Sequence, residues 1–408
     1  MSIEEIARFA KIKGLNVVGT GDFTHPEWLK EIKNSVVQDG VTGLYYVPTK
    51  PVPHVGFMLT TEVCTIFESR ERSHKVHHVI LAPNLDVVDQ INDRLRKYGD
   101  LSADGRPILK MSASHLVEEV FESSNANMVF PAHVWTPWFS VFGAFSGFDI
   151  IDECYEDMTQ HIKALETGLS SDPPMNWRLS RLDKFTLVSN SDSHSFWPWR
   201  IGREANVFEF EQPSYEAILN AISTRDPSHF KFTIETDPAY GKYHWTGHRN
   251  CNVSISPQEA KAIGNICPVC HRQLTKGVEQ RVEELADRPA TFTPKGWPGF
   301  MRLLPLSEII ATVLGVDSPS TQAIWKVYNA LIAKFGSEYT VLMDISRNAL
   351  SEVVEPRFAD AIVRVREGNI TVVPGFDGVY GKLVFGTVAV PQPRIVRSVL
   401  QSNLSDFW

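Results

Sequence analysis

The stretch VVGTGDFTHP at residues 17–26 ends a short apolar run in two polar side chains, Asp22 and His25. The same arrangement recurs in MVFPAH at residues 128–133 and in FTLVSNSDSH at residues 185–194. Short apolar runs of this kind predict buried strands. In a parallel α/β barrel, the carboxyl ends of the strands meet at one mouth, where the chemistry takes place. We therefore expect polar residues that are far apart in the sequence to converge at one site.

Strand-like and helix-like segments alternate from residue 3 to about residue 234, which predicts an α/β fold with a mostly parallel sheet. Strands are expected at residues 15–19, 43–47, 56–60, 78–81, 127–132, 164–166, 185–189 and 206–208. Helices are expected at residues 3–13, 87–97, 112–121 and 215–223. The number of strands fits a closed or nearly closed barrel.

The composition of the chain changes after residue 235, and we expect four parts. They are a barrel domain at residues 1–235, a Cys- and His-bearing module at 236–290, a smaller mixed α/β region at 291–396 and a tail at 397–408. Within the third part, residues 306–335 have a helical pattern and residues 363–390 have Val-rich strand patterns.

Size and composition favour a multidomain protein without a membrane span. A chain of 408 residues predicts two or three domains, and a hydrophobic fraction of 43% is enough to build cores. No stretch reaches the ~18 apolar residues of a membrane helix. The start, MSIEE, is acidic and unlike a signal peptide, so a cytoplasmic location is expected. The net charge of -8 gives no global sign of nucleic-acid binding, although basic residues can cluster locally.

Carboxylates and imidazoles next to the apolar runs form a candidate metal site. They are Asp22, His25, Glu62, His77 or His78, His133, Asp192 and His194. Such side chains bind Mg²⁺, Mn²⁺ or Zn²⁺ and leave positions open for water and substrate. Two or three ions of this kind would clamp a phosphodiester. A single His beside a strand is more often structural, but the recurrence at three strand ends favours a metal site, with Asp192, His194 and His133 as its catalytic ligands.

Three of the five cysteines lie in one segment with the spacing of a structural zinc site. His248-x2-Cys251 is followed after fifteen residues by Cys267-x2-Cys270. Two such short turns can place four donors tetrahedrally around Zn²⁺. His244 and His271 are alternatives to His248 as the fourth ligand. An odd number of cysteines argues against a disulfide framework.

These motifs together resemble one family of nucleases. The strand-end ligands are similar to those of the PHP (polymerase and histidinol phosphatase) superfamily, whose fold is a distorted (β/α)7 barrel. Within it, GTGDFTHP at residues 19–26, SDSHS at 191–195 and CPVC at 267–270 resemble endonuclease Q. The resemblance implies a metal-dependent endonuclease that nicks double-stranded DNA 5′ of uracil, hypoxanthine or xanthine, and at abasic sites. It also implies that the zinc module and residues 291–396 help to hold DNA, and we expect a monomer.

One departure from the superfamily concerns its first strand, which carries a His-x-His pair of metal ligands. No such pair precedes Asp22 here, and the opening residues resemble the helix that follows that strand. The expectation is therefore that this strand is absent, through a misassigned start, a truncation or a real loss. Metal binding is then expected to be impaired and catalysis weak or lost.

Aromatic and basic residues near the motifs are candidate DNA contacts. Trp135 and Trp197 flank the ligand motifs and could stack on an everted base, or lie in the core. Arg249, Lys276 and Arg281 lie around the zinc segment and could contact phosphates, or belong to an ordinary solvated surface.

The last eight residues, QSNLSDFW, resemble the PCNA-interacting peptide of sliding-clamp partners. Leu404, Phe407 and Trp408 would fall on one side of a helical turn, while Gln401 reaches a polar pocket. The alternative is that the two aromatic residues fold back onto the protein's own core. The resemblance implies a PCNA-type clamp as a partner and an archaeal source.

Three functions compete on the sequence alone. The first is a DNA repair endonuclease of the endonuclease Q type. The second is a PHP phosphatase that acts on a small phosphoester, which would need neither the zinc segment nor the tail. The third is a lesion-binding protein whose catalysis is impaired by the missing His-x-His.

Overall fold

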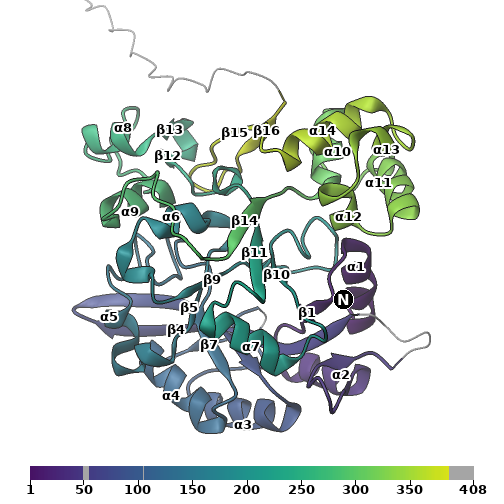
Figure 1. Cartoon of the computed structure of the whole chain (residues 1–408). Coiled ribbons are helices and arrows are strands. Elements are labelled where there is room, and N and C mark those ends of the chain that lie inside the picture. Colours follow the sequence, from purple (N-terminus) through teal and green to yellow (C-terminus); the bar gives the residue numbers. More distant parts are fainter. Residues whose placement is uncertain (49–54, 104, 386–408) are drawn as a thin grey trace, which may run out of the picture.

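The computed structural model describes residues 1–48, 55–103 and 105–385, which fold around a seven-stranded mixed sheet (Figure 1). The centre of this sheet is a long hairpin of β4 (Gly56–Ser69) and β5 (Arg72–Ala82). Five shorter strands complete it: β1 (Val17–Gly19), β2 (Val37–Gln38), β3 (Tyr45–Tyr46), β6 (Ile108–Leu109) and β7 (Met128–Pro131). The strands β1 and β6 pair in parallel with β4, and β7 pairs antiparallel with β5.

The hairpin corrects the expectation of a mostly parallel sheet with short strands at residues 56–60 and 78–81. Arg70 and Glu71 both have left-handed backbones, with φ of 51° and 62°. A two-residue turn with two positive φ angles matches the twist of antiparallel strands, and Asn-Gly is its usual sequence signal. Because Arg-Glu carries no such signal, the sequence does not reveal the turn. The two strands are therefore longer than predicted and antiparallel.

The remaining strands of the first 302 residues form three further ladders, one of which lies within the Cys- and His-bearing module. The strands β8 (Ala164–Glu166) and β9 (Thr186–Val188) pair in parallel. A three-stranded ladder joins β10 (Ala205–Phe208), β11 (Phe230–Glu235) and β14 (Gly299–Arg302). The described residues thus form a mixed α/β fold in separate ladders rather than one continuous barrel ladder. Strands of only three or four residues, separated by long loops, leave gaps in the hydrogen bonding between neighbours.

Helices lie outside these sheets. They are α1 (Ile3–Lys13), α2 (Pro26–Ser35), α3 (Leu85–Leu95), α4 (Ala113–Ser123), α5 (Asp152–Tyr155), α6 (Pro173–Trp177) and α7 (Tyr215–Thr224). The bounds of α1 are those predicted, because Ser2 and Glu5 form a capping box and Gly14 ends the helix with φ of 100°. No helix among the described residues is both long and apolar enough to span a membrane.

The Cys- and His-bearing module follows β11 and packs beside the first domain. It contains β12 (Thr246–His248), β13 (Val253–Ile255), α8 (Pro257–Ala262) and α9 (Val278–Leu285). The next strand, β14, returns to pair in parallel with β11. The module is therefore inserted between two neighbouring strands of one ladder, so the expected boundary at residue 290 leaves β14 outside the sheet to which it belongs.

The C-terminal region is a helical domain followed by a small hairpin. It consists of α10 (Leu306–Leu314), α11 (Gln322–Phe335), α12 (Glu338–Met343), α13 (Arg347–Ser351), α14 (Pro356–Arg366), β15 (Thr371–Val373) and β16 (Lys382–Val384). The expected strand pattern from residue 363 is wrong at its start. Val363 and Val365 lie in α14, where Val365 is buried on the apolar face of the helix.

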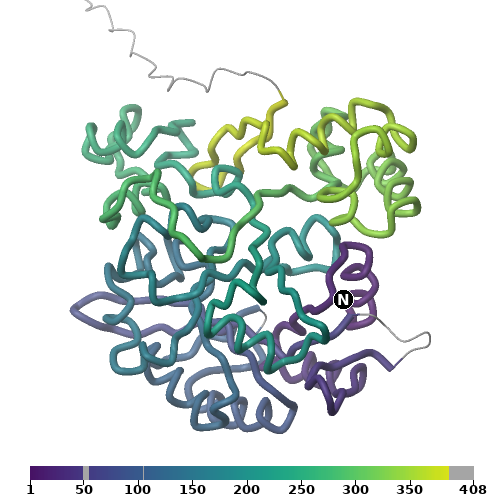
Figure 2. The backbone as a smooth tube through the Cα atoms, in the orientation of Figure 1, coloured from purple at the N-terminus to yellow at the C-terminus, as the bar shows by residue number. Residues whose placement is uncertain are grey.

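A buried ion pair joins the first helix to the C-terminal helical domain. The helix α1 lies against α12 (Figure 2), and Lys13 Nζ donates to Glu338 Oε1 at 2.6 Å and to the Pro198 carbonyl oxygen at 2.8 Å. Glu338 also accepts hydrogen bonds from Leu306 N and the Tyr328 hydroxyl. A buried pair contributes little net stability, but an unpaired partner costs about 3–5 kcal/mol. The contact therefore fixes how the helical domain docks.

Candidate metal centre

Three side chains meet at the centre of the β4–β5 hairpin. Glu62 Oε1 lies 2.9 Å from His77 Nδ1 and 3.3 Å from His133 Nε2. The two imidazole nitrogens are 3.1 Å apart. One ligand atom from each residue lies within 4.8 Å of the other two. One carboxylate and two imidazoles form a donor set that suits a divalent ion with open coordination positions, so the residues present fit the metal that the sequence predicts.

The strand register decides which of the two adjacent histidines joins this centre. Cys64 pairs with His77, and Val63 pairs with His78, so His77 shares a face of the sheet with Glu62. His78 points the other way. Its side chain is fully buried, and its ring nitrogens contact Thr65 Oγ1 at 2.9 Å and the Tyr155 hydroxyl at 2.8 Å. His78 is therefore a core residue, which corrects its place among the candidate ligands.

The other predicted ligands lie at the rim of the centre. Asp192 Oδ1 is 3.2 Å from His194 Nε2, and His194 is largely exposed. Asp22 is close enough to Glu62 and His194 for their charges to act on it. His25 stands at the N-terminus of α2 without a capping hydrogen bond and is not among the clustered donors of the described residues. The structure thus brings six of the predicted residues together, three in the donor cluster and three at its rim, and leaves His25 outside the cluster.

Three of the ligand-bearing positions have left-handed backbones. The φ angles are 45° at Asp22, 31° at His133 and 43° at Asp192. Asp and His are among the non-glycine residues that adopt this conformation most often, but it still costs about 1–3 kcal/mol at each position. The turn after each of these strands directs the side chain into the mouth. Backbone strain therefore accompanies these three predicted strand ends.

Two residues of the centre escaped the sequence analysis. The carboxylate of Glu166 lies behind His133 and accepts hydrogen bonds from His133 N and from Asn190 Nδ2, both at 2.7 Å. Arg106 Nε lies 2.5 Å from Glu62 Oε1, and its NH2 group lies 2.6 Å from Asp192 Oδ1. Glu166 ends the apolar strand β8, so the strand-end rule that found the other ligands applies to it as well. Arg106 lies in a loop with no comparable signal.

The charges of the centre are strongly coupled. Burial would raise the pKa of Glu62, but hydrogen bonds from His133 and His77 and the positive charge of Arg106 hold it well below its usual range. Burial would also raise the pKa of Asp192, but the hydrogen bond with His194 and the positive charge of Arg106 lower it to about 2. Burial raises the pKa of Glu166 to about 7. Glu62 and Asp192 therefore favour the ionised form that metal ligands need, whereas burial raises the pKa of Asp22.

A cleft opens beside the loop that carries Asp22. It has a volume of about 470 Å³ and is lined by Thr24 and Pro26 from this loop and by Asn92, Arg96 and Asp100 from the opposite side. Ligand-binding clefts typically measure about 300–1,000 Å³. Its volume falls within this range, and none of the residues that line it belongs to the donor cluster of Glu62, His77 and His133.

The two aromatic residues predicted to contact DNA differ in their exposure to solvent. Trp135 is fully buried and donates from Nε1 to Asn176 Oδ1 at 2.8 Å, so its expected DNA contact is wrong. Trp197 is 38% exposed and stacks on Trp199, with ring centroids 5.1 Å apart. Trp197 is therefore available at the surface beside His194.

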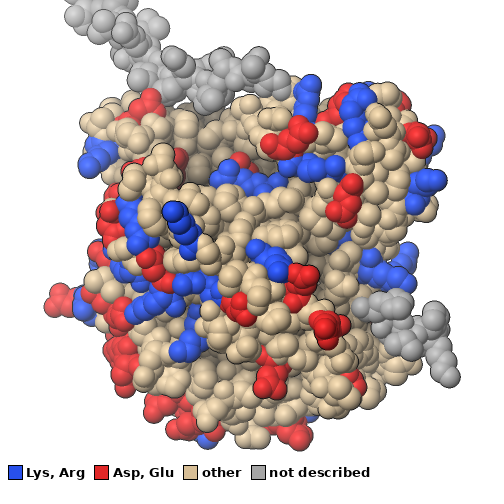
Figure 3. Space-filling view, viewed as in Figure 1, with Lys and Arg blue, Asp and Glu red and all other residues tan. Residues whose placement is uncertain are grey.

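The three predicted basic contacts also differ in availability. The side chain of Arg281 is only 13% exposed and bonds the Phe142 and Phe148 carbonyl oxygens, so it docks α9 onto the first domain instead of facing DNA. Lys276 is held by both carboxylate oxygens of Glu284 at 2.8 Å. Arg249 is exposed. On one face of the molecule, Lys and Arg side chains gather around a hollow between the zinc module and β15 (Figure 3).

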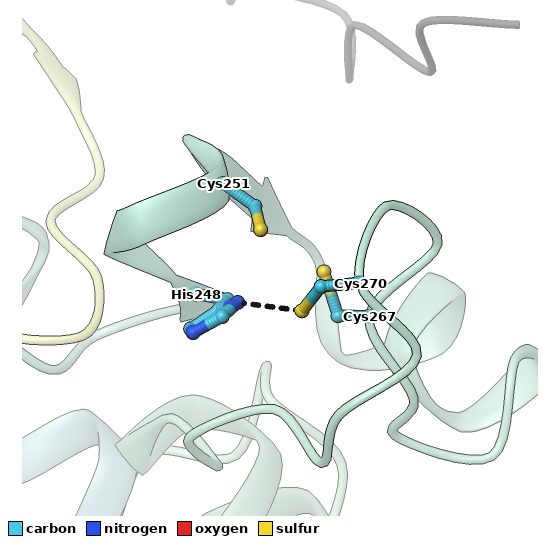
Figure 4. A group of neighbouring side chains, drawn as sticks. All are labelled: His248, Cys251, Cys267 and Cys270. Atoms are coloured by element: carbon cyan, nitrogen blue, oxygen red, sulfur yellow. Dashed lines mark hydrogen bonds between the residues drawn. The ribbon is translucent and has the colours of Figure 1, made fainter. Parts of the chain in front are cut away.

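The Cys/His module brings the four predicted zinc ligands together (Figure 4). Donor atoms of His248, Cys251, Cys267 and Cys270 all lie within 4.8 Å of one another, and His248 Nδ1 is 3.3 Å from Cys270 Sγ. The geometry favours His248 over the two alternatives. A small core of Val253, Ile255, Ala260 and Leu274 surrounds the ligands, and a core of this size leaves much of the folding free energy to a bound ion.

The predicted clamp-binding residues Gln401, Leu404, Phe407 and Trp408 lie outside the described residues.

Two solved structures share the fold of this chain. The crystal structure of the lesion-specific endonuclease PfuEndoQ from Pyrococcus furiosus superimposes with a TM-score of 0.82 and 32% identity, over 100% of this chain and 94% of that one. Endonuclease Q in complex with a 27-mer duplex that has an abasic lesion at the active site also gives a TM-score of 0.82 and 32% identity, over 100% and 95% of the two chains.

Two further relatives are known by sequence. The uncharacterised protein MJ0043 of Methanocaldococcus jannaschii is 34% identical over 260 residues, which are 62% of this chain and only 31% of that protein. The uncharacterised protein YqxK of Bacillus subtilis is 26% identical over 379 residues, 91% of this chain and 89% of its own. Residues 305–369, which include α10–α14, match the MJ0043 C-terminal domain family.

The two solved structures that share this fold over the full length of the chain are a lesion-specific endonuclease and an endonuclease Q complex. The chain belongs to the endonuclease Q family. The predicted loss of a His-x-His strand stays a prediction.

Gly168 provides a test of how His133 is positioned. Its φ is 61°, and a Cβ added there would lie 2.7 Å from His133 Cβ. We expect Gly168→Ala to displace His133, weaken Mn²⁺ binding and lower the free energy of unfolding by about 2–4 kcal/mol, because overpacking adds to backbone strain. Gly315→Ala is the control, since its φ is 68° and no atom lies within 4 Å of its Cβ. Calorimetric Mn²⁺ titration and thermal unfolding measure both effects; equal Mn²⁺ affinities for the two variants would contradict the expectation.

The zinc site is tested by Cys267→Ser. We expect this variant to lose one equivalent of zinc and to become susceptible to proteolysis within residues 246–274, because metal binding and folding of the module are linked. Elemental analysis and limited proteolysis are the measurements. Cys154→Ser, at a buried cysteine outside the cluster, should keep its zinc. Full zinc content in the Cys267 variant would exclude this residue as a ligand.

Proposed function

We propose that this protein is a divalent-metal-dependent DNA repair endonuclease. The observation that carries the proposal is the donor cluster of Glu62, His77 and His133 at the mouth of a fold shared, at 32% identity, with an endonuclease Q bound to a duplex with an abasic lesion. A small-molecule phosphatase would have no use for the inserted zinc module or the helical domain. Both modules are instead suited to hold a long, charged substrate.

In this proposal, the residues of the mouth have different roles. Glu62, His77 and His133 would hold a divalent ion, and Asp22, Asp192 and His194 would complete its surroundings from the rim. A bound divalent ion supplies a water of lowered pKa and stabilises charge on a phosphodiester. Glu166 fixes His133 by accepting its backbone N–H. The exposed side of His194 and the nearby Trp197 face the space that DNA would enter.

We further propose that the lesions are uracil, hypoxanthine, xanthine and abasic sites, with the nick on their 5′ side. Membership in the endonuclease Q family supports this range. The cleft beside Thr24 and Pro26 is large enough for an unstacked base, and base flipping costs least at damaged positions. This cleft is the space in which selectivity for a deaminated base would arise.

A nicking assay tests the proposed activity. End-labelled duplexes that contain one uracil, hypoxanthine or abasic site should be cut 5′ of the lesion with Mg²⁺ or Mn²⁺ and left intact with EDTA. Because Glu62 contacts both histidines, Glu62→Gln should lower the rate by at least about 100-fold. Glu118→Gln, on the exposed face of α4, is the matched control and should cut at the wild-type rate.

Each other outcome identifies one of the competing functions. Tight binding of lesion duplexes without any cut would indicate a lesion-binding protein. Release of phosphate from p-nitrophenyl phosphate without any effect on DNA would indicate a small-molecule phosphatase. Metal-independent nicking would contradict the role given to the cluster.

We also propose that Gln401, Leu404, Phe407 and Trp408 bind a PCNA-type sliding clamp, on the strength of their sequence pattern. Phe407→Ala/Trp408→Ala should abolish binding to a purified archaeal clamp in surface plasmon resonance, because the aromatic plug is lost. Ser402→Ala, at a variable position of the same pattern, should bind as the wild type does. Unchanged binding of the double variant would reject the proposal.

A further inference from the structure

Arg106 connects two carboxylates that come from opposite parts of the mouth. Its Nε lies 2.5 Å from Glu62 on β4, and its NH2 group lies 2.6 Å from Asp192 in the loop after β9. The side chain is 23% exposed, so it is neither free in solvent nor sealed in the core. The NH2 group donates a hydrogen bond to Asp192, whereas the contact of Nε with Glu62 is an ion pair in which Nε has no hydrogen-bond partner among the described residues.

The two carboxylates need a cation in this place. Their side chains are only 17% and 30% exposed, and a carboxylate withdrawn from water is costly unless it is paired. Across residues 1–48, 55–103 and 105–385, no other Lys or Arg side chain forms an ion pair with either of them. Arg106 thus supplies the positive charge that a divalent ion would otherwise supply to the same oxygens.

The backbone directly after Arg106 is bonded to β4. Cys64 N donates to the Pro107 carbonyl oxygen at 2.9 Å, and β6 begins at Ile108 as a parallel partner of β4. Residues 107 and 108 therefore stay beside β4 when the Arg106 side chain turns. Rotation about the bonds of the Arg side chain can move the guanidinium from the carboxylates toward the open mouth without displacing the strand.

We propose that Arg106 is a charge-compensating residue of this centre. It holds Glu62 and Asp192 together until they take up their divalent ion, and it then releases at least one of them. The freed guanidinium is placed to contact a phosphate of the DNA. This second step rests on the function proposed above, whereas the first step concerns metal binding alone and does not.

The test is Arg106→Met in the full chain, which keeps the apolar stem and removes the charge. With no competing guanidinium, Mn²⁺ in calorimetric titration without DNA should bind about three- to tenfold tighter than to the wild type, as expected for the loss of one or two partly exposed ion pairs. In EDTA the variant should unfold at a lower temperature, and saturating Mn²⁺ should close this gap. Unchanged or weaker Mn²⁺ binding would overturn the proposal.

A second arginine serves as a matched control. Arg94 also bridges two carboxylates, those of Glu119 and Glu122, which do not belong to the donor cluster, and its side chain is 33% exposed. Arg94→Met should lower the unfolding temperature in EDTA and in Mn²⁺ alike, and leave Mn²⁺ affinity unchanged. Arg106→Lys keeps the charge but can pair with fewer oxygens, so its Mn²⁺ affinity should lie between those of the wild type and the Met variant.

The phosphate contact is measured separately. At saturating Mn²⁺, Arg106→Met should raise KM for an abasic duplex by about tenfold, because a charge-assisted contact to DNA is lost. Tighter Mn²⁺ binding with an unchanged KM would reject the phosphate contact and keep the first step. If the wild type itself does not nick, the proposed function fails, and the Mn²⁺ titration still decides whether Arg106 competes with the ion.

Discussion

The hydrogen-bonded ladder between β4 and β5 is the constraint on which the rest of the structure depends. It runs from the pair Leu59 and Ala82 to the pair Ser69 and Arg72, and β1, β3, β6 and β7 all attach to one of its two strands. Because side chains alternate along a strand, this one register sends Glu62 and His77 toward the mouth and His78 into the core. A slip of one residue would reverse these positions and destroy the centre.

Much of the centre follows from one rule that sequence can apply, namely that polar residues directly after buried strands converge. This rule finds Asp22, His133 and Asp192, and it would also have found Glu166 had it been applied to the last residue of the predicted strand at 164–166 as well as to the residues after a strand. The hairpin turn at Arg70 was beyond it, because a left-handed Arg-Glu pair has no local signature. Arg106 was equally hidden, since its partners are fixed only when a loop folds across β4. The sequence therefore predicts which residues follow a strand, but it does not predict which strands or which side chains pair across the sheet.

Several features of the mouth are unfavourable in free energy, and the surrounding fold must offset them. Left-handed backbones at Asp22, His133 and Asp192 are each unfavourable, and the carboxylates beside them are partly withdrawn from water. Cationic and hydrogen-bonding partners compensate for the second cost, as the low pKa of Asp192 reflects. A site held under strain in this way is arranged for a cation, because a divalent ion at the same oxygens would relieve the repulsion between acids without any change of backbone.

Arg281 docks the zinc module onto the first domain, which explains how the module can contribute to the mouth without contacting it. Its guanidinium fastens α9 to the Phe142 and Phe148 carbonyl oxygens of the loop that follows His133, and β14 fastens the other end of the insertion to β11. The module is therefore anchored at both ends to elements next to the centre. The backbone that carries the exposed Arg249 is therefore part of a module held against the first domain. A charge on a rigidly docked module can set the path of a nucleic-acid strand toward the mouth, which a charge on a tethered one cannot do.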